Sequence, residues 1–166
     1  MAKKKIQKPL KQVSNHITKL LDQAKVKYKI LEHKVVYTAH DAAQTTKKKL
    51  GEIAKVVLVK ADRDLALIVV PAGKYVDFKG IKKTLKAKKI LLASEKDIEK
   101  YLKTKVGLLH PFGSQYNIQT LLDKGMAKTK KMIASAGSYT HSVEIALKDF
   151  EKLVKPIKGT FAKSKK

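Results

Sequence analysis

A single lysine stands inside an apolar, β-branched segment of the sequence. Lys55 is the third residue of Ile53–Val59, which reads IAKVVLV. A buried charge without a partner costs several kcal/mol, so this ammonium group must bind a partner, extend toward solvent, or face a cleft in which an anionic ligand compensates it. The pattern alone supports a structural role and a functional role equally.

The segment Gly107–Gly113, GLLHPFG, is the second candidate. Two glycines and a proline within a short stretch predict a tight loop whose backbone approaches a ligand closely. A simple connection between two elements is the alternative. Asp123 ends the apolar run TLLD, where its carboxylate either faces a ligand or caps the next turn.

The five histidines do not form a metal-binding pattern. His33 and His40 lie on either side of a predicted strand-to-helix turn, where each either lines a pocket or is an ordinary surface residue. No two histidines have the i, i+4 spacing of a helical metal site, and cysteine is absent, so no metal is predicted. The nucleophile-elbow, P-loop and dinucleotide-binding motifs are also absent, and no cofactor is expected.

Charge is the strongest compositional feature. The 166 residues include 38 Lys and Arg against 14 Asp and Glu, a formal net charge of +24, and Arg63 is the only arginine. Residues 1–11 hold five lysines and residues 152–166 hold six, with no acid in either stretch. This distribution predicts binding of a polyanion through phosphate contacts, which lysine favours over the reading of base edges. The alternatives are a lysine-biased genome, a need for solubility, and an anionic membrane surface.

The candidate residues require a scaffold of intermixed helices and strands. Ile53–Val59 and Leu65–Val70 predict a hairpin that is buried on both faces and carries Lys55. Thr38 begins a capping-box pattern that opens a helix ending near Gly51, and Ser94 with Asp97 three residues on forms a second capping box, which opens a helix through Leu102. The other predicted elements are helix 13–24, strand 26–30, helix 78–86, strand 89–92, helix 94–102, strands 118–122, 131–135 and 143–147, and a last helix through residue 154.

These elements predict one mixed α/β domain over residues 13–155, between a basic disordered arm at 1–12 and a basic C-terminal tail at 156–166. The sequence has no apolar run long enough to span a membrane. Its first residues lack the apolar core of a secretory signal. A cytoplasmic protein is therefore expected.

Six segments, in their order and spacing, resemble the YbaK family, whose relatives include the editing domain inserted in bacterial prolyl-tRNA synthetases and related free-standing deacylases. The segments are EH…YTAHDAA, IAKVVLVK, LALIVVPAGKYVDFKGIKK, GLLHPFG, TLLD and ASAGSYTHSVEIALKDFEKL. Each is weak alone, whereas all six in sequence are fairly specific. The resemblance covers the chain from about Ile17 to Leu153.

The resemblance implies a curled, barrel-like mixed sheet surrounded by helices. It also implies trans-editing: hydrolysis of the ester that joins a small, wrong amino acid to a tRNA, in this family often the proline tRNA. The family's essential lysine falls on Lys55, and its G-x-x-x-P loop falls on Gly107–Pro111, where backbone N–H groups near Gly107 would hold the developing oxyanion. The residues implied to contact the substrate are His33, Thr38, Ala39, His110, Pro111, Asp123 and Gly137. The implied partners are the mischarged tRNA and, as a candidate, an aminoacyl-tRNA synthetase.

Two residues depart from the family pattern. Val56 stands where a hydroxyl residue usually follows the lysine, and His110 stands where a small residue is common. Both departures bear on which amino acid is accepted. The rival hypotheses are a non-catalytic tRNA- or RNA-binding module of the same fold and a basic surface-association protein, and the presence of Lys55 with the glycine loop favours the deacylase over the first of them.

Replacing Gly107 with alanine tests the loop. If the backbone here approaches the substrate, the added Cβ should lower the single-turnover deacylation rate tenfold or more, because one lost oxyanion donor costs about 2.7–4 kcal/mol. The dissociation constant for the same tRNA, measured by filter binding, should barely change. Equal losses of rate and affinity would mean that the loop is structural or belongs to the RNA contact surface.

Overall fold

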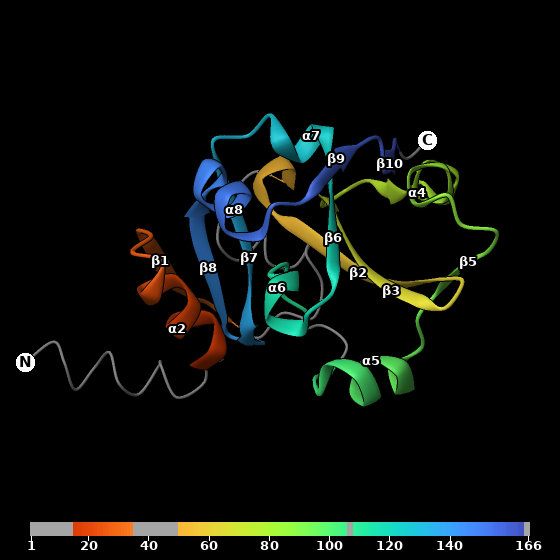
Figure 1. The fold of residues 1–166 in the computed structure, drawn as a ribbon. Coiled ribbons are helices and arrows are strands. Elements are labelled where there is room, and N and C mark those ends of the chain that lie inside the picture. The colour runs from red at the N-terminus through yellow and green to blue at the C-terminus, as the bar shows by residue number, and fades with distance from the viewer. Residues whose placement is uncertain (1–14, 35–49, 106–107, 165–166) are drawn as a thin grey trace, which may run out of the picture.

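The computed structural model of the protein describes residues 15–34, 50–105 and 108–164, which form a mixed α/β domain (Figure 1). The described helices are α2 (Asn15–Gln23), α4 (Phe78–Leu85), α5 (Glu95–Leu102), α6 (Gly113–Tyr116), α7 (Lys124–Ala127) and α8 (Leu147–Val154), with the 3-10 helix η1 (Leu50–Glu52). The described strands are β1 (Tyr28–Glu32), β2 (Ala54–Ala61), β3 (Asp64–Pro71), β4 (Tyr75–Val76), β5 (Ile90–Leu92), β6 (Gln119–Asp123), β7 (Lys131–Ser138), β8 (His141–Ala146), β9 (Ile157–Gly159) and β10 (Ala162–Lys163).

The larger sheet has the strand order β5-β2-β3-β6-β9. β5, β2 and β3 are antiparallel, whereas β3, β6 and β9 are parallel. β2 and β3 pair continuously from Ala54–Pro71 to Ala61–Asp64, and the residues between them form a tight turn in which Asp62 has a φ of 56°. The predicted hairpin is therefore confirmed.

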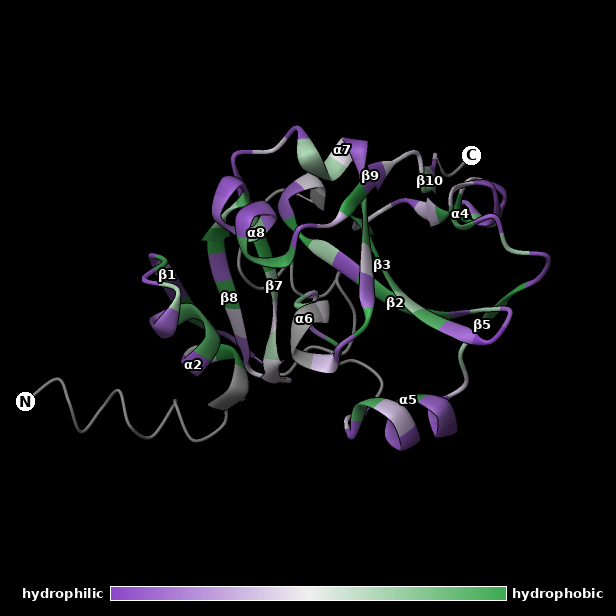
Figure 2. Ribbon diagram, in the orientation of Figure 1, coloured by the Kyte–Doolittle hydropathy of each residue, from purple (hydrophilic) through white to green (hydrophobic). Residues whose placement is uncertain are grey.

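The two faces of this hairpin pack against different helices. Val59 belongs to the cluster that contains Ile81 of α4, whereas Leu58 packs with Ile98 of α5. Because successive side chains of a strand point to opposite faces, Lys55 lies on the same face as Val59, which we call the α4 face. Figure 2 shows mainly apolar residues along β2 and β3 and many hydrophilic residues on α4 and α5.

The smaller sheet has the order β1-β8-β7 and is antiparallel. Val143 and Ile145 of β8 pack with Ile17 and Leu21 of α2 and with Phe150 of α8. Alternation of the side chains gives this sheet one apolar face toward these helices.

Among the described residues, the two sheets are linked by one isolated parallel bridge, between Ile53 and Ile133. A barrel requires strand pairing that continues around the whole sheet. The strands instead form separate sheets of three, two and five strands, so the mixed α/β fold is confirmed and the barrel-like closure is not.

Local capping signals are confirmed where the structure describes them. The backbone N–H of Asp97 donates to Ser94 Oγ at 3.1 Å, and the N–H of Ser94 donates to Asp97 Oδ2 at 3.0 Å, which is the predicted capping box of α5. The hydrogen bonds to Ser94 and the Lys60 side chain hold the pKa of Asp97 at about 2. The helix predicted to begin at Thr38 lies outside the described residues up to η1.

The structure corrects the boundary expected at residue 155. The chain continues into β9, which pairs with β6, and into β10, which pairs with β4. Between them Phe161 is fully buried in the cluster on the α4 face. The sequence suggested a tail because lysines outnumber apolar residues here, whereas a short strand needs only alternate residues to be buried.

Replacing Phe161 with alanine should lower the free energy of unfolding by about 3–5 kcal/mol, because it leaves a cavity in the cluster on the α4 face. Urea unfolding followed by circular dichroism measures this. The exposed neighbour Lys163 provides the control, and Lys163→Ala should change the stability little. A similar small effect of both substitutions would show that the C-terminal strands do not belong to the folded core.

Candidate functional site

Lys55 is half-buried near the start of β2, opposite Val70 of β3. Its Nζ donates a hydrogen bond of 3.3 Å to the carbonyl oxygen of Lys74. This oxygen belongs to the peptide group that joins Lys74 to Tyr75, the first residue of β4. The ammonium group is therefore held beside the turn between β3 and β4.

Asp123 lies on the same face of the sheet, two strands from Lys55. Val69 of β3 pairs with Leu122 of β6, so the next residues, Val70 and Asp123, continue the row that begins at Lys55. With about 4.8 Å between neighbouring strands, the backbones of Lys55 and Asp123 are roughly 10 Å apart.

The carboxylate of Asp123 is bound by the backbone. Its side chain is 4 % exposed. Oδ2 accepts the N–H of Gly125 at 2.8 Å, and Oδ1 accepts the N–H groups of Phe161 at 2.8 Å and Ala162 at 3.0 Å. Asp123 thus caps α7, as one sequence alternative expected, and also fixes the C-terminal segment. This geometry supports a structural role.

The described part of the glycine-proline loop is packed into the domain. His110, Pro111 and Phe112 are buried, and the His110 ring stacks on Tyr116 with centroids 4.5 Å apart and planes 14° apart. His110 Nδ1 accepts the N–H of Phe112 at 3.2 Å. Burial raises the pKa of Tyr116 to about 12, so its hydroxyl stays protonated. His110 therefore shapes the loop through contacts of its ring.

His33 and Gly137 lie at one end of the smaller sheet. His33 follows β1, its backbone N–H donates to the carbonyl of Thr140 at 2.9 Å, and its Nε2 lies 2.9 Å from Ser142 Oγ. Gly137 lies in the irregular part of β7 just before the turn to β8 and has a φ of 80°. Because that conformation strains a residue with a Cβ, glycine is favoured there.

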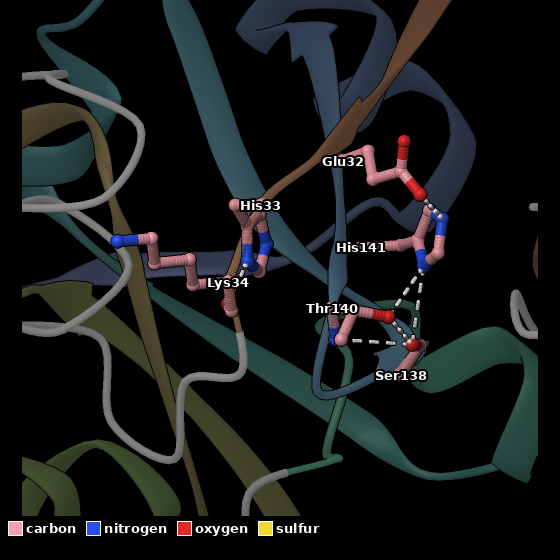
Figure 3. A network of polar contacts seen from close by, with 6 residues as sticks. All are labelled: Glu32, His33, Lys34, Ser138, Thr140 and His141. Atoms are coloured by element: carbon pink, nitrogen blue, oxygen red, sulfur yellow. Dashed lines mark hydrogen bonds and ion pairs between the residues drawn. The ribbon is translucent and has the colours of Figure 1, made fainter.

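A buried histidine in the same region was not singled out from the sequence. His141 is 1 % exposed. Its Nδ1 lies 2.9 Å from Thr140 Oγ1 and 3.3 Å from Ser138 Oγ, and its Nε2 faces the Glu32 carboxylate at 3.8 Å (Figure 3). Burial lowers the pKa of His141, although Glu32 opposes the shift, so the ring is neutral at pH 7.

The spacing of hydroxyl groups around His141, in Ser138-Tyr139-Thr140-His141, is the sequence signal that could have identified it. The two hydroxyls and the ring cross-link the hairpin that joins β7 to β8. This hairpin carries Gly137 and accepts the backbone of His33. His141 is therefore a positioning residue for that end of the sheet.

The structure brings several of the candidate residues onto neighbouring strands. The Ile53–Ile133 bridge joins the start of β2, which carries Lys55, to β7, which carries Gly137. Ser142 pairs with Ser135 of β7 and holds His33. Four candidate residues from the sequence lie outside the described residues, and their placement stays a prediction: Thr38, Ala39, His40 and Gly107.

A groove of about 570 Å³ lies at the opposite end of the smaller sheet from His33. It is lined by residues of β1, β7 and β8, among them Lys29, Lys131 and Glu144, and contains none of the predicted site residues. In the part of the chain that the structure describes, no three His, Asp or Glu side chains are placed to hold a metal ion. No described helix is long and apolar enough to cross a membrane.

Comparison with known proteins identifies the family. The sequence model of the aminoacyl-tRNA editing domain matches residues 33–153. That range is most of the chain and includes every candidate residue described above. The chain belongs to the aminoacyl-tRNA editing domain family. It is thus an aminoacyl-tRNA deacylase, an enzyme that hydrolyses mischarged aminoacyl-tRNA.

A curated relative matches most of the chain, and two solved structures share its fold. The prolyl-tRNA editing protein ProX of Acetoanaerobium sticklandii is 26% identical over 147 residues, which cover 85% of this chain and 90% of that protein. The hypothetical protein APE2540 has a similar fold, with a TM-score of 0.83 at 16% identity over 90% of this chain and 100% of that one. A candidate trans-editing enzyme for prolyl tRNA synthetase matches with a TM-score of 0.78 at 16% identity, over 90% and 96% of the two chains.

Titration of His141 should make the stability of this editing domain depend on pH. Because burial depresses the pKa of the folded state below the usual value of about 6.5, the unfolded chain binds the proton first as the pH falls. The stabilising effect of the neutral ring is therefore complete above pH 6.5 and is lost at lower pH. Urea unfolding at pH 7.5 and 5.5 should show that the free energy of unfolding falls more for the wild type than for His141→Gln. Equal decreases in the two proteins would contradict a buried neutral ring.

Proposed function

We propose that this editing domain acts in trans and removes a small, wrongly attached amino acid from a tRNA, with proline tRNA as the first candidate. The curated relative is named as a prolyl-tRNA editing protein, and one structural relative is described as a candidate trans-editing enzyme for prolyl tRNA synthetase. The observation that carries the proposal is the ammonium group of the half-buried residue Lys55, which donates to a backbone carbonyl just before the apolar run Val56–Val59.

Lys55 binds either the terminal phosphate of the tRNA or the carbonyl oxygen of the aminoacyl ester. A fixed positive charge at the ester carbonyl stabilises the oxyanion that forms when water attacks the carbonyl carbon. Collapse of the tetrahedral intermediate breaks the bond to the ribose oxygen, which takes a proton, and releases the free amino acid and the tRNA. An aminoacyl ester is already activated, so we assign no side chain as general base.

The other candidate residues form and shape the pocket. Backbone N–H groups near Gly107 share the oxyanion with Lys55. The part of the pocket that receives the amino acid is lined by His33, Thr38, Ala39 and Gly137. His110, Pro111 and Asp123 act indirectly, because all three are buried and the Asp123 carboxylate accepts three backbone N–H groups. A pocket of this kind selects by size, and one methylene changes the preference by only about 1–3 kcal/mol.

The positive charge of the chain supports a tRNA substrate. The formal net charge is +24, and lysine neutralises phosphates without reading the sequence of the bases. We place the enzyme in the cytoplasm, where an aminoacyl-tRNA synthetase supplies its mischarged substrate. The charge alone does not identify the reaction, since it would serve a non-catalytic tRNA-binding module, the rival hypothesis from the sequence, equally well.

A panel of mischarged tRNAs tests the function directly. Proline tRNA and one unrelated tRNA, each carrying glycine, alanine, serine, cysteine or threonine, are incubated with the protein, and correctly charged tRNAs serve as controls. We expect fast hydrolysis of at least one small aminoacyl ester and no hydrolysis of the controls. Binding of these tRNAs without hydrolysis of any would favour the non-catalytic module.

Lys55→Ala should abolish deacylation without unfolding the protein. Lys60 offers a matched control, because it lies on the same strand, is also half-buried, and pairs with Asp97 at 3.0 Å. Lys60→Ala should keep most of the activity. Turnover and circular dichroism are measured on the same samples. Full activity in a folded Lys55→Ala variant would remove the catalytic assignment.

A further inference from the structure

Two aromatic side chains are exposed beside the turn that holds Lys55. Tyr75 is 50 % exposed and Phe78 is 40 % exposed. They flank Asp77, the N-cap of α4, whose Oδ1 accepts the N–H groups of Lys79 and Gly80. Most large apolar side chains described in this domain are buried, so two exposed rings within four residues suggest a contact surface.

This surface is strongly basic. Lys74, Lys79, Lys82 and Lys83 are exposed around the two rings, and Lys163 pairs with Tyr75 across the β4–β10 ladder. In the sequence from residue 74 to residue 94, the only acid is Asp77, and its carboxylate is engaged in the helix cap. A ligand that contacts the rings therefore meets several positive charges.

The turn that carries Tyr75 also contacts Lys55. The carbonyl that accepts the hydrogen bond from Lys55 belongs to the peptide group that joins Lys74 to Tyr75. Val76 and Ile81 pack on the α4 face of the larger sheet, where Lys55 also lies. Tyr75 is thus separated from the ammonium group by a single peptide group.

We propose that Tyr75 and Phe78 stack with unpaired nucleotides at the 3′ end of the tRNA substrate. The ester that an editing enzyme cleaves is on the terminal ribose, at the end of an unpaired stretch, so bases must lie near Lys55 when the ester does. Aromatic rings bordered by lysines bind single-stranded nucleic acid, since the rings stack with bases and the lysines contact the phosphates. This assignment rests on the proposed function and names the residues that would recognise the substrate end.

Tyr101 provides a control within the same chain. It is 47 % exposed, and Lys100 lies over its ring at 5.1 Å from the centroid. Its helix, α5, packs on the opposite face of the hairpin through Ile98, and Asp97 of this helix forms a salt bridge with Lys60. Tyr101 therefore has similar chemistry away from Lys55.

Two uncharged RNA hairpins test the proposal by fluorescence anisotropy. One ends in a four-nucleotide single-stranded 3′ overhang, and the other has the same duplex with a blunt end. We expect Tyr75→Ala and Phe78→Ala each to weaken binding of the overhang hairpin by about 5- to 150-fold, the range for the loss of one stacked base. Binding of the blunt hairpin should not change. Tyr101→Ala should leave both affinities unchanged.

Ring-preserving variants separate stacking from folding. Tyr75→Phe and Phe78→Tyr should retain overhang binding, whereas Phe78→Leu, which keeps an apolar side chain, should lose it. Unchanged overhang binding in both alanine variants, or an equal loss for both hairpins, would overturn the proposal. Binding of the same variants to vesicles of anionic phospholipid is measured as well. If the alanine variants lose binding to the vesicles and keep both hairpin affinities, the proposal is overturned and the rings belong to a membrane-binding surface.

The test is independent of catalysis because the hairpins carry no amino acid. If the wild type hydrolyses no mischarged tRNA but prefers the overhang hairpin through these rings, the proposed function fails and the stacking surface stands. If the wild type edits but shows no ring-dependent preference, the stacking surface alone fails.

Discussion

The surroundings of Lys55 depend on the hydrogen bonds that the buried carboxylate of Asp123 accepts from the backbone. The carboxylate accepts three backbone N–H groups, two of them from Phe161 and Ala162, and a buried carboxylate without such partners would be strongly unfavourable. These bonds fix β10, which pairs with β4. The peptide group that enters β4 then accepts the hydrogen bond from Lys55. The position of the proposed catalytic ammonium group thus depends on a carboxylate two strands away.

Several acidic residues in the described part of the chain serve its internal structure. Asp77 and Asp97 cap helices, Asp123 binds backbone, and Glu144 and Glu151 pair with Lys131 and Lys158. Most lysines, in contrast, lie on the surface as separate point charges. The external field is therefore dominated by lysine, which attracts a polyanion without selecting its sequence. Selectivity for a particular ester must come from the residues near Lys55 and from the pocket.

Much of the fold could be predicted from the sequence. Apolar periodicity predicted the β2–β3 hairpin, the helix α5 and the strands β6, β7 and β8. The spacing of Ser94 and Asp97 predicted the capping box of α5. The isolated charge in IAKVVLV singled out Lys55. The C-terminal strands were missed because lysines mask two very short apolar patterns around Phe161. His141 was missed because its burial depends on strands brought together from opposite ends of the chain, and its own segment gives no periodic signal of that packing.

The sequence by itself determined the local elements, because side-chain periodicity and caps act between residues a few positions apart. It also determined the net positive charge and the family motifs. Only the tertiary structure decided the partners of Lys55 and Asp123. Phe161 is 38 residues from Asp123 along the chain. The side chains of Lys55 and Asp123 both bind backbone groups. Almost every residue carries the same N–H and C=O, so residue identity does not reveal which of them a buried carboxylate or ammonium group will bind.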